Sequence, residues 1–155
     1  MLIMSVVGTP FVLEVRQVLE LNMREIDSVA VVGASRDPEK YGYKVLMDLK
    51  NGGYKAFAIN PGCVEGDEIE GVPCYPDLLS IPNVPDLLIT VVPPKVTEKI
   101  VRQAKELGIE KIWMQPGSES EYAISFSEEN GIGVMHNACI MIFRKEGVLK
   151  KGHRP

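Results

Sequence analysis

Short apolar runs rich in β-branched residues recur along the chain and predict five buried strands. The runs are four to seven residues long, which is typical of strands and too short for most helices. Because they are continuously apolar, we expect strands that are covered on both faces. The predicted strands cover residues 28–32, 55–59, 86–92, 111–114 and 133–136.

The segments between these runs carry apolar residues at the spacing of an amphipathic helix. Val12, Val15, Leu19 and Met23 show this spacing ahead of the first strand. Glycine or proline residues mark several of the predicted helix ends. The predicted helices cover residues 11–23, 41–50, 96–107 and 119–129.

The alternation of strands and helices predicts an α/β fold with a parallel sheet and right-handed crossovers. We expect a doubly wound, Rossmann-like, three-layer αβα domain over residues 25–143. Residues 1–24 form an N-terminal helical extension in this interpretation, and residues 144–155 form a basic tail in solvent. The Gly- and Pro-rich stretch 61–85 has few periodic positions and is interpreted as a long surface loop.

Length, charge and hydropathy disfavour several classes of protein. A chain of 155 residues fits one domain, and its net charge of −4 disfavours extensive binding to nucleic acid. No apolar run approaches the ~20 residues that a membrane span needs. The apolar N-terminus has no preceding basic region and makes a poor signal peptide, so a cytoplasmic protein is expected.

The chain has three cysteines, at positions 63, 74 and 139. Their odd number and the lack of a Cys-x-x-Cys spacing argue against a disulfide framework and against a structural zinc site. The sequence therefore predicts reduced thiols and no metal site.

Small residues follow the first strand, where a doubly wound sheet binds its ligands. Gly33, Ala34 and Ser35 allow close approach of backbone N–H groups to a phosphate, and Arg36 adds positive charge. Lys40 and Lys44 add further cations. The alternative is that these residues only close a tight strand-to-helix turn.

The end of the second strand argues against a nicotinamide dinucleotide. Such a site usually has an acidic residue about 20 residues beyond the glycine motif, to bind the ribose. Here the strand ends in Asn60 and Pro61, and the next glycine after Gly33 is Gly42. An adenine nucleotide with a different phosphate arrangement remains open.

Five short segments together resemble the small stand-alone coenzyme A (CoA)-binding proteins, which are similar to the N-terminal domain of the succinyl-CoA synthetase α subunit. They are Val-Ala-Val-Val-Gly-Ala-Ser at 29–35, Ile-Asn-Pro-Gly at 59–62, Val-Val-Pro-Pro at 91–94, Trp-Met-Gln-Pro-Gly at 113–117 and His-Asn-Ala-Cys-Ile-Met-Ile at 136–142. The resemblance implies a Rossmann-like fold that holds CoA or acyl-CoA at the strand ends. It nominates as binding residues Gly33, Ala34, Ser35, Arg36, Asn60, Pro61, Val92, Pro93, Met114, Gln115 and Pro116, to which we add Lys40, Tyr41 and Gly42 from the glycine loop.

The chain departs from the synthetase pattern in two ways. Cys63 stands where the synthetase loop has a lysine after Pro-Gly, and the chain ends before the domain that carries the phosphorylated histidine. We therefore expect a binding protein without ligase machinery and without catalytic residues.

Two other functions stay open at this stage. The first is a nicotinamide- or acyl-CoA-dependent enzyme that uses His136 or Cys139. The second is a CoA-sensing module that acts through a protein partner or a homo-oligomer. A third, narrower hypothesis concerns Cys63, whose thiol could exchange with the thiol of CoA.

Overall fold

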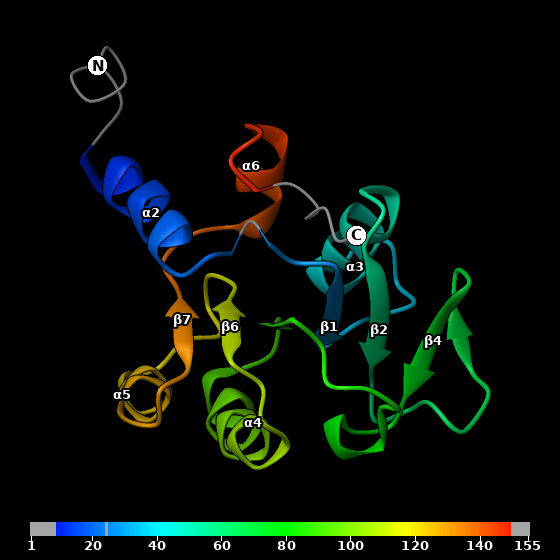
Figure 1. The fold of residues 1–155 in the computed structure, drawn as a ribbon. Coiled ribbons are helices and arrows are strands. Elements are labelled where there is room, and N and C mark those ends of the chain that lie inside the picture. The colour runs from blue at the N-terminus through cyan, green and yellow to red at the C-terminus, as the bar shows by residue number, and fades with distance from the viewer. Residues whose placement is uncertain (1–8, 24, 150–155) are drawn as a thin grey trace.

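The computed structural model describes residues 9–23 and 25–149. Their backbone forms a seven-stranded sheet in the order β3-β4-β2-β1-β5-β6-β7. All neighbouring strands are parallel except β3 and β4. The sheet confirms the predicted doubly wound, Rossmann-like α/β fold (Figure 1).

All five predicted strands are present, with shifts of a few residues at some ends. They are β1 (Ser28–Val32), β2 (Lys55–Ile59), β5 (Leu87–Thr90), β6 (Lys111–Met114) and β7 (Gly133–Met135). The four predicted helices are also present, as α2 (Thr9–Glu20), α3 (Tyr41–Asn51), α4 (Pro94–Leu107) and α5 (Glu121–Glu129).

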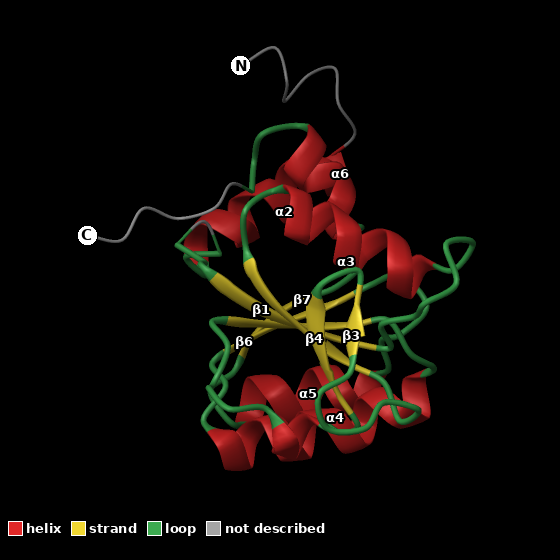
Figure 2. Ribbon diagram, turned by 90° about the vertical axis from the view of Figure 1, so that its right-hand side faces the viewer, coloured by secondary structure: helices red, strands yellow, loops and turns green. Residues whose placement is uncertain are grey.

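The helices form two layers, one on each face of the sheet (Figure 2). Helices α2 and α3 lie on one face together with a further helix, α6 (Ile140–Lys145), and α4 and α5 lie on the other. Each face has its own cluster of buried apolar side chains. No helix within residues 9–23 and 25–149 is both long enough and apolar enough to cross a membrane.

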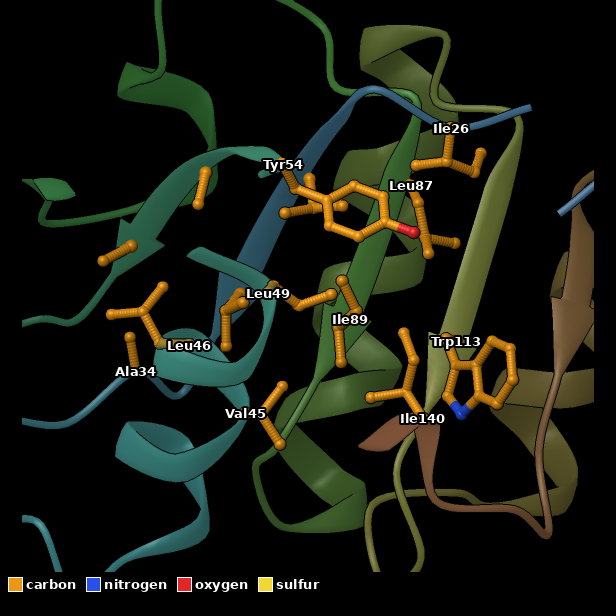
Figure 3. Close-up of a cluster of buried hydrophobic side chains, with 14 of the residues drawn as sticks. Ile26, Ala34, Val45, Leu46, Leu49, Tyr54, Leu87, Ile89, Trp113 and Ile140 are labelled. Atoms are coloured by element: carbon orange, nitrogen blue, oxygen red, sulfur yellow. The ribbon is translucent and has the colours of Figure 1, made fainter. Parts of the chain in front are cut away.

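Figure 3 shows the cluster on the α3 face, where side chains of α3 meet those of the central strands. Trp113 is fully buried there, its ring centroid lies 5.3 Å from that of Phe143, and its Nε1 donates to the carbonyl of Ala138 at 2.9 Å. Trp113 is thus a core residue, as expected for an aromatic side chain within a strand.

The stretch 61–85 is not one long loop, which corrects the sequence prediction. It contains β3 (Glu68–Ile69), β4 (Val72–Tyr75) and the short 3-10 helix η1 (Leu78–Ser80). β3 has two residues and Pro73 lies inside β4, so neither forms an uninterrupted apolar run that marks a strand in the sequence. β4 is held in the sheet by pairing with β2, through Ala58 and Cys74 and through Ile59 and Tyr75.

The predicted reduced state of Cys63 and Cys74 is also wrong, because these residues form a disulfide. Pairing of β4 with β2 brings position 74 next to the loop that follows β2, and the two Cα atoms lie 6.0 Å apart. An odd cysteine count does not exclude one bond, and Cys139 is the cysteine left free.

The start of the predicted tail is packed against the domain, contrary to the expectation of a segment in solvent. Arg144 lies at the end of α6 and pairs with Asp48 of α3, and Leu149 is 1% exposed. Residues 150–155 of the predicted tail, and residues 1–8 of the predicted N-terminal extension, lie outside the described residues.

Candidate functional site

The carboxyl ends of the parallel strands meet at one edge of the sheet. The chain leaves β1 toward β2 on one side and later returns to β5 on the other side of β1. Ligands of doubly wound sheets bind at such a reversal of strand order. The loops after β1, β5 and β6 therefore form the candidate site.

The loop after β1 is closely packed at two glycines. Gly33 has a φ of +95°, and a Cβ added to it would lie 2.1 Å from the carbonyl oxygen of Val91. A Cβ on Gly42, in the first turn of α3, would lie 1.9 Å from the carbonyl oxygen of Gly33. Only glycine fits at either position, so the exit of β1, the exit of β5 and the start of α3 are brought into contact.

The three residues predicted to donate to phosphate are placed differently. The N–H of Gly33 is already used, because it donates to the carbonyl of Ile59 at 3.1 Å. The side chain of Ala34 lies in the buried cluster on the α3 face (Figure 3). The Ser35 Oγ accepts a hydrogen bond from the N–H of Asp37 at 3.0 Å.

The predicted cations lie around this loop. Arg36 is turned toward the disulfide loop, where its Nη2 lies 3.6 Å from the Asp67 carboxylate and 3.9 Å from Cys63 Sγ. Lys40 is exposed and immediately precedes α3. The Lys44 Nζ lies 5.3 Å from the centre of the Tyr41 ring, which is a cation–π contact.

Asn60 joins the loops after β1 and β2. Its Nδ2 donates to the carbonyl of Ala34 at 2.8 Å, and its Oδ1 accepts from the N–H of Gly62 at 2.7 Å. An amide can perform both roles, whereas an ionised aspartate can only accept. The residue that replaces the ribose-binding acid therefore organises the backbone, and Pro61 beside it is exposed.

The loop after β6 is held by buried hydrogen bonds. Gln115 is 5% exposed, its Oε1 accepts from the N–H of Ile140 at 2.7 Å, and its Nε2 donates to Cys139 Sγ at 3.3 Å. Ser118 is 2% exposed, and its Oγ lies 2.9 Å from Thr90 Oγ1. These bonds fix the loop against β5 and against the start of α6.

A cavity of about 510 Å³ opens between these loops, within the usual size range of ligand pockets. Its walls are mostly apolar. It is lined by Tyr41, Val91, Val92, Pro93, Gln115, Pro116, Gly117, Ser118 and Cys139.

Five of the predicted site residues line this cavity: Tyr41, Val92, Pro93, Gln115 and Pro116. Eight others belong to the adjoining loops or to the start of α3 and are not among its lining residues: Gly33, Ala34, Ser35, Arg36, Lys40, Gly42, Asn60 and Pro61. Met114 is fully buried in the cluster on the α4 and α5 face.

Sequence reasoning missed Val91, Gly117 and Ser118 as lining residues, although their loops were singled out. Cys139 was considered as a candidate catalytic residue, with or without His136, and not as a binding residue. No hydrogen bond joins His136 to Cys139 in the described structure, where the sulfur has Gln115 as its partner. Within residues 9–23 and 25–149 no cluster of three or more His, Cys, Asp or Glu side chains could hold a metal ion.

Comparison with known proteins identifies the family. The family model described as a CoA binding domain matches residues 27–145. The chain belongs to this family of CoA-binding domains. The matched range includes every strand of the sheet and both loops whose residues line most of the cavity.

Members and relatives of this family differ greatly in length. The chain is 30% identical to ADP-forming acetate–CoA ligase II of Archaeoglobus fulgidus, over 81% of the chain and 22% of the ligase. It is 37% identical to the α subunit of the corresponding Pyrococcus furiosus ligase, over 54% of the chain and 18% of that subunit. The chain thus spans about a fifth of the length of these relatives.

Small proteins share the fold over most of this chain. A solved Pyrococcus horikoshii protein is 28% identical with a TM-score of 0.75, covering 86% of this chain and 89% of that one. A Pyrococcus furiosus protein is 40% identical with a TM-score of 0.69, covering 75% and 97%. The CoA-binding domain is therefore found both inside long ligases and as a small single-domain chain.

Proposed function

We propose that this chain binds CoA or acyl-CoA at the carboxyl edge of its sheet. The observation that carries the proposal is the cavity itself. It begins at Tyr41, the first residue of α3, and continues along the loops after β5 and β6. One elongated ligand could then contact a helix N-terminus with one end and apolar walls with the other.

The diphosphate is assigned to the start of α3. The first N–H groups of a helix lack the usual acceptor four residues earlier, and the helix dipole favours negative charge there. In α3 the N–H groups of Tyr43 and Lys44 donate to the Lys40 carbonyl, so those of Tyr41 and Gly42 are assigned to the ligand. The first turn of α3 holds no acidic residue, and Lys40 and Lys44 are exposed beside it. Since Gly33 donates to Ile59, its role is to bring α3 close to the strand ends rather than to donate to the ligand.

The pantetheine arm is assigned to the cavity. Val91, Val92, Pro93 and Pro116 present an apolar surface against which the apolar groups of this arm can pack. The few polar groups nearby, on Gln115 and Ser118, are buried and already hydrogen-bonded. Such a wall fits the methyl and methylene groups of a flexible ligand arm better than a second nucleotide.

Calorimetric titration of the whole chain with CoA tests the proposal. We expect binding of CoA and none of NAD at the same concentration. Lys40→Glu places a negative charge at the start of α3 and should weaken CoA binding at least about tenfold, which corresponds to 1.4 kcal/mol. Lys99→Glu is the matched control, because Lys99 is exposed and lies on a different helix, α4. This variant should bind CoA like the unmodified chain.

The absence of heat from CoA and acetyl-CoA at high micromolar concentration would contradict the proposal. If Lys40→Glu and Lys99→Glu weaken CoA binding equally, the effect comes from net charge alone. That result would contradict the assignment of the diphosphate to α3.

A further inference from the structure

The free cysteine of the described structure lies in the wall of the ligand cavity. Cys139 is partly exposed, and it lines the same cavity as Tyr41 and Pro93. Cys63 and Cys74, in contrast, are 4% and 1% exposed and are bonded to each other. Cys139 is thus the one sulfur among them that a molecule in the cavity can reach.

The side chain of Gln115 positions the Cys139 sulfur, and its amide has a single orientation that satisfies both of its hydrogen bonds. The Gln115 Oε1 accepts the N–H of Ile140 at 2.7 Å, so the amide cannot flip without losing that bond. Its Nε2 therefore faces the sulfur, at 3.3 Å. Because Gln115 is 5% exposed, this donor is shielded from water and positions the sulfur at the cavity surface.

The cavity connects the predicted diphosphate site with Cys139. Tyr41, the first residue of α3, and Cys139 both line it, and Gln115 holds Cys139 beside the loop after β6. A ligand whose diphosphate binds at the start of α3 can therefore reach Cys139 through the cavity with its pantetheine arm, whose terminal group is a thiol.

We propose that Cys139 forms a mixed disulfide with CoA, a step that rests on the proposed binding of CoA in this cavity. The co-reactant is the symmetrical disulfide of CoA. The Cys139 thiolate attacks one sulfur of that disulfide, the S–S bond of the reagent breaks, and a new bond joins Cys139 Sγ to one CoA sulfur. The second CoA leaves as a thiolate and takes up the proton that Cys139 released, so no external oxidant is needed.

The test is intact-mass spectrometry of the whole chain during incubation with CoA disulfide, followed by peptide mapping without reductant. We expect one CoA per chain, located on the peptide that contains Cys139. Because binding positions the two sulfurs, the adduct should form at least about tenfold faster than with oxidised glutathione at equal concentration. Reduced CoA should slow the reaction by occupying the cavity, and dithiothreitol should remove the adduct.

Two controls separate this proposal from the binding of CoA itself. Cys139→Ser should form no adduct, and its thermal unfolding shows whether it is folded. Calorimetry of the unmodified chain with reduced CoA measures binding independently of sulfur chemistry. Binding without an adduct, an adduct mapped to Cys63 or Cys74, or an equal rate with oxidised glutathione would overturn the proposal while leaving CoA binding intact. No binding of reduced CoA would instead overturn the proposed function.

Discussion

At the scale of single residues, the site depends on positions where only one side chain fits. Gly33 and Gly42 bring three backbone segments into contact that a Cβ would hold apart. Asn60 and Gln115 each use the donor and the acceptor of one amide to join two loops. These residues hold the backbone of the site in place, and we expect their contribution to ligand binding to be indirect.

Gly33→Ala should lower the free energy of unfolding by about 3 kcal/mol or more, because a positive φ and a backbone clash add up. The new Cβ would lie 2.1 Å from a carbonyl oxygen, which cannot move away as a flexible side chain could. Gly66→Ala is the matched control, since Gly66 has a φ of +90° with no atom within 4 Å, and should cost about 1 kcal/mol. Urea unfolding measures both, and equal costs would contradict the close contact.

The burial of Tyr54 is expected to make the fold less stable at alkaline pH. Its side chain is 5% exposed, and burial raises the pKa of its hydroxyl above the usual value, an effect that the nearby Arg144 only partly offsets. The protonated hydroxyl is favoured in the folded state, so its contribution to stability is complete below about pH 10 and is lost as the pH rises above that value.

Tyr54→Phe should therefore flatten the loss of unfolding free energy at alkaline pH, where one buried ionisation accounts for up to about 1.4 kcal/mol per pH unit. Urea unfolding of both proteins between neutral and strongly alkaline pH measures the difference. Parallel curves for the two proteins would show that Tyr54 does not ionise on unfolding.

At the scale of elements, α6 is one of the parts that the sequence pattern did not reveal, together with β3, β4 and η1. Helix α6 has six residues, too few for a helical period to be recognised, and its position is set by contacts with distant segments. Arg144 Nε lies 2.8 Å from Asp48 Oδ2, and its Nη2 donates to the Asp48 carbonyl at 3.0 Å. Through this contact α6, which follows Cys139, is docked against α3, which begins at Tyr41.

Arg144→Ala should destabilise the fold by about 2 kcal/mol, since charge-assisted hydrogen bonds are lost and Asp48 keeps its charge in a half-buried place. Lys145→Ala, at the exposed neighbouring position, should change stability by less than about 0.5 kcal/mol. Both are measured by urea unfolding. Equal small effects would mean that the Arg144 pair contributes no more than a surface ion pair.

At the scale of the whole molecule, two helical layers bury separate clusters on the faces of one sheet, and a disulfide ties β4 to the loop that follows β2. The Cys63–Cys74 bond closes a loop with a sequence separation of 11 residues. A bond of this kind stabilises mainly by restricting the unfolded chain, so its effect belongs to the whole domain.

Reduction of this bond should lower the free energy of unfolding by about 2–3 kcal/mol. Urea unfolding with and without dithiothreitol measures the change, and Cys139→Ser should show the same shift. A thiol count on the denatured, unreduced chain is the direct check and should give one thiol from the three cysteines. Three free thiols would contradict the bond.

The sequence by itself determined the order and type of the main elements, because apolar periodicity and breaking residues act over a few neighbouring positions. It also located the loops after β1, β2, β5 and β6, and the resemblance carried by those loops led to the family. Only the tertiary structure decided the disulfide, the short strands β3 and β4, the docking of α6 and the position of Cys139 in the cavity wall. Each of these depends on which distant strands become neighbours, and no local pattern encodes that order.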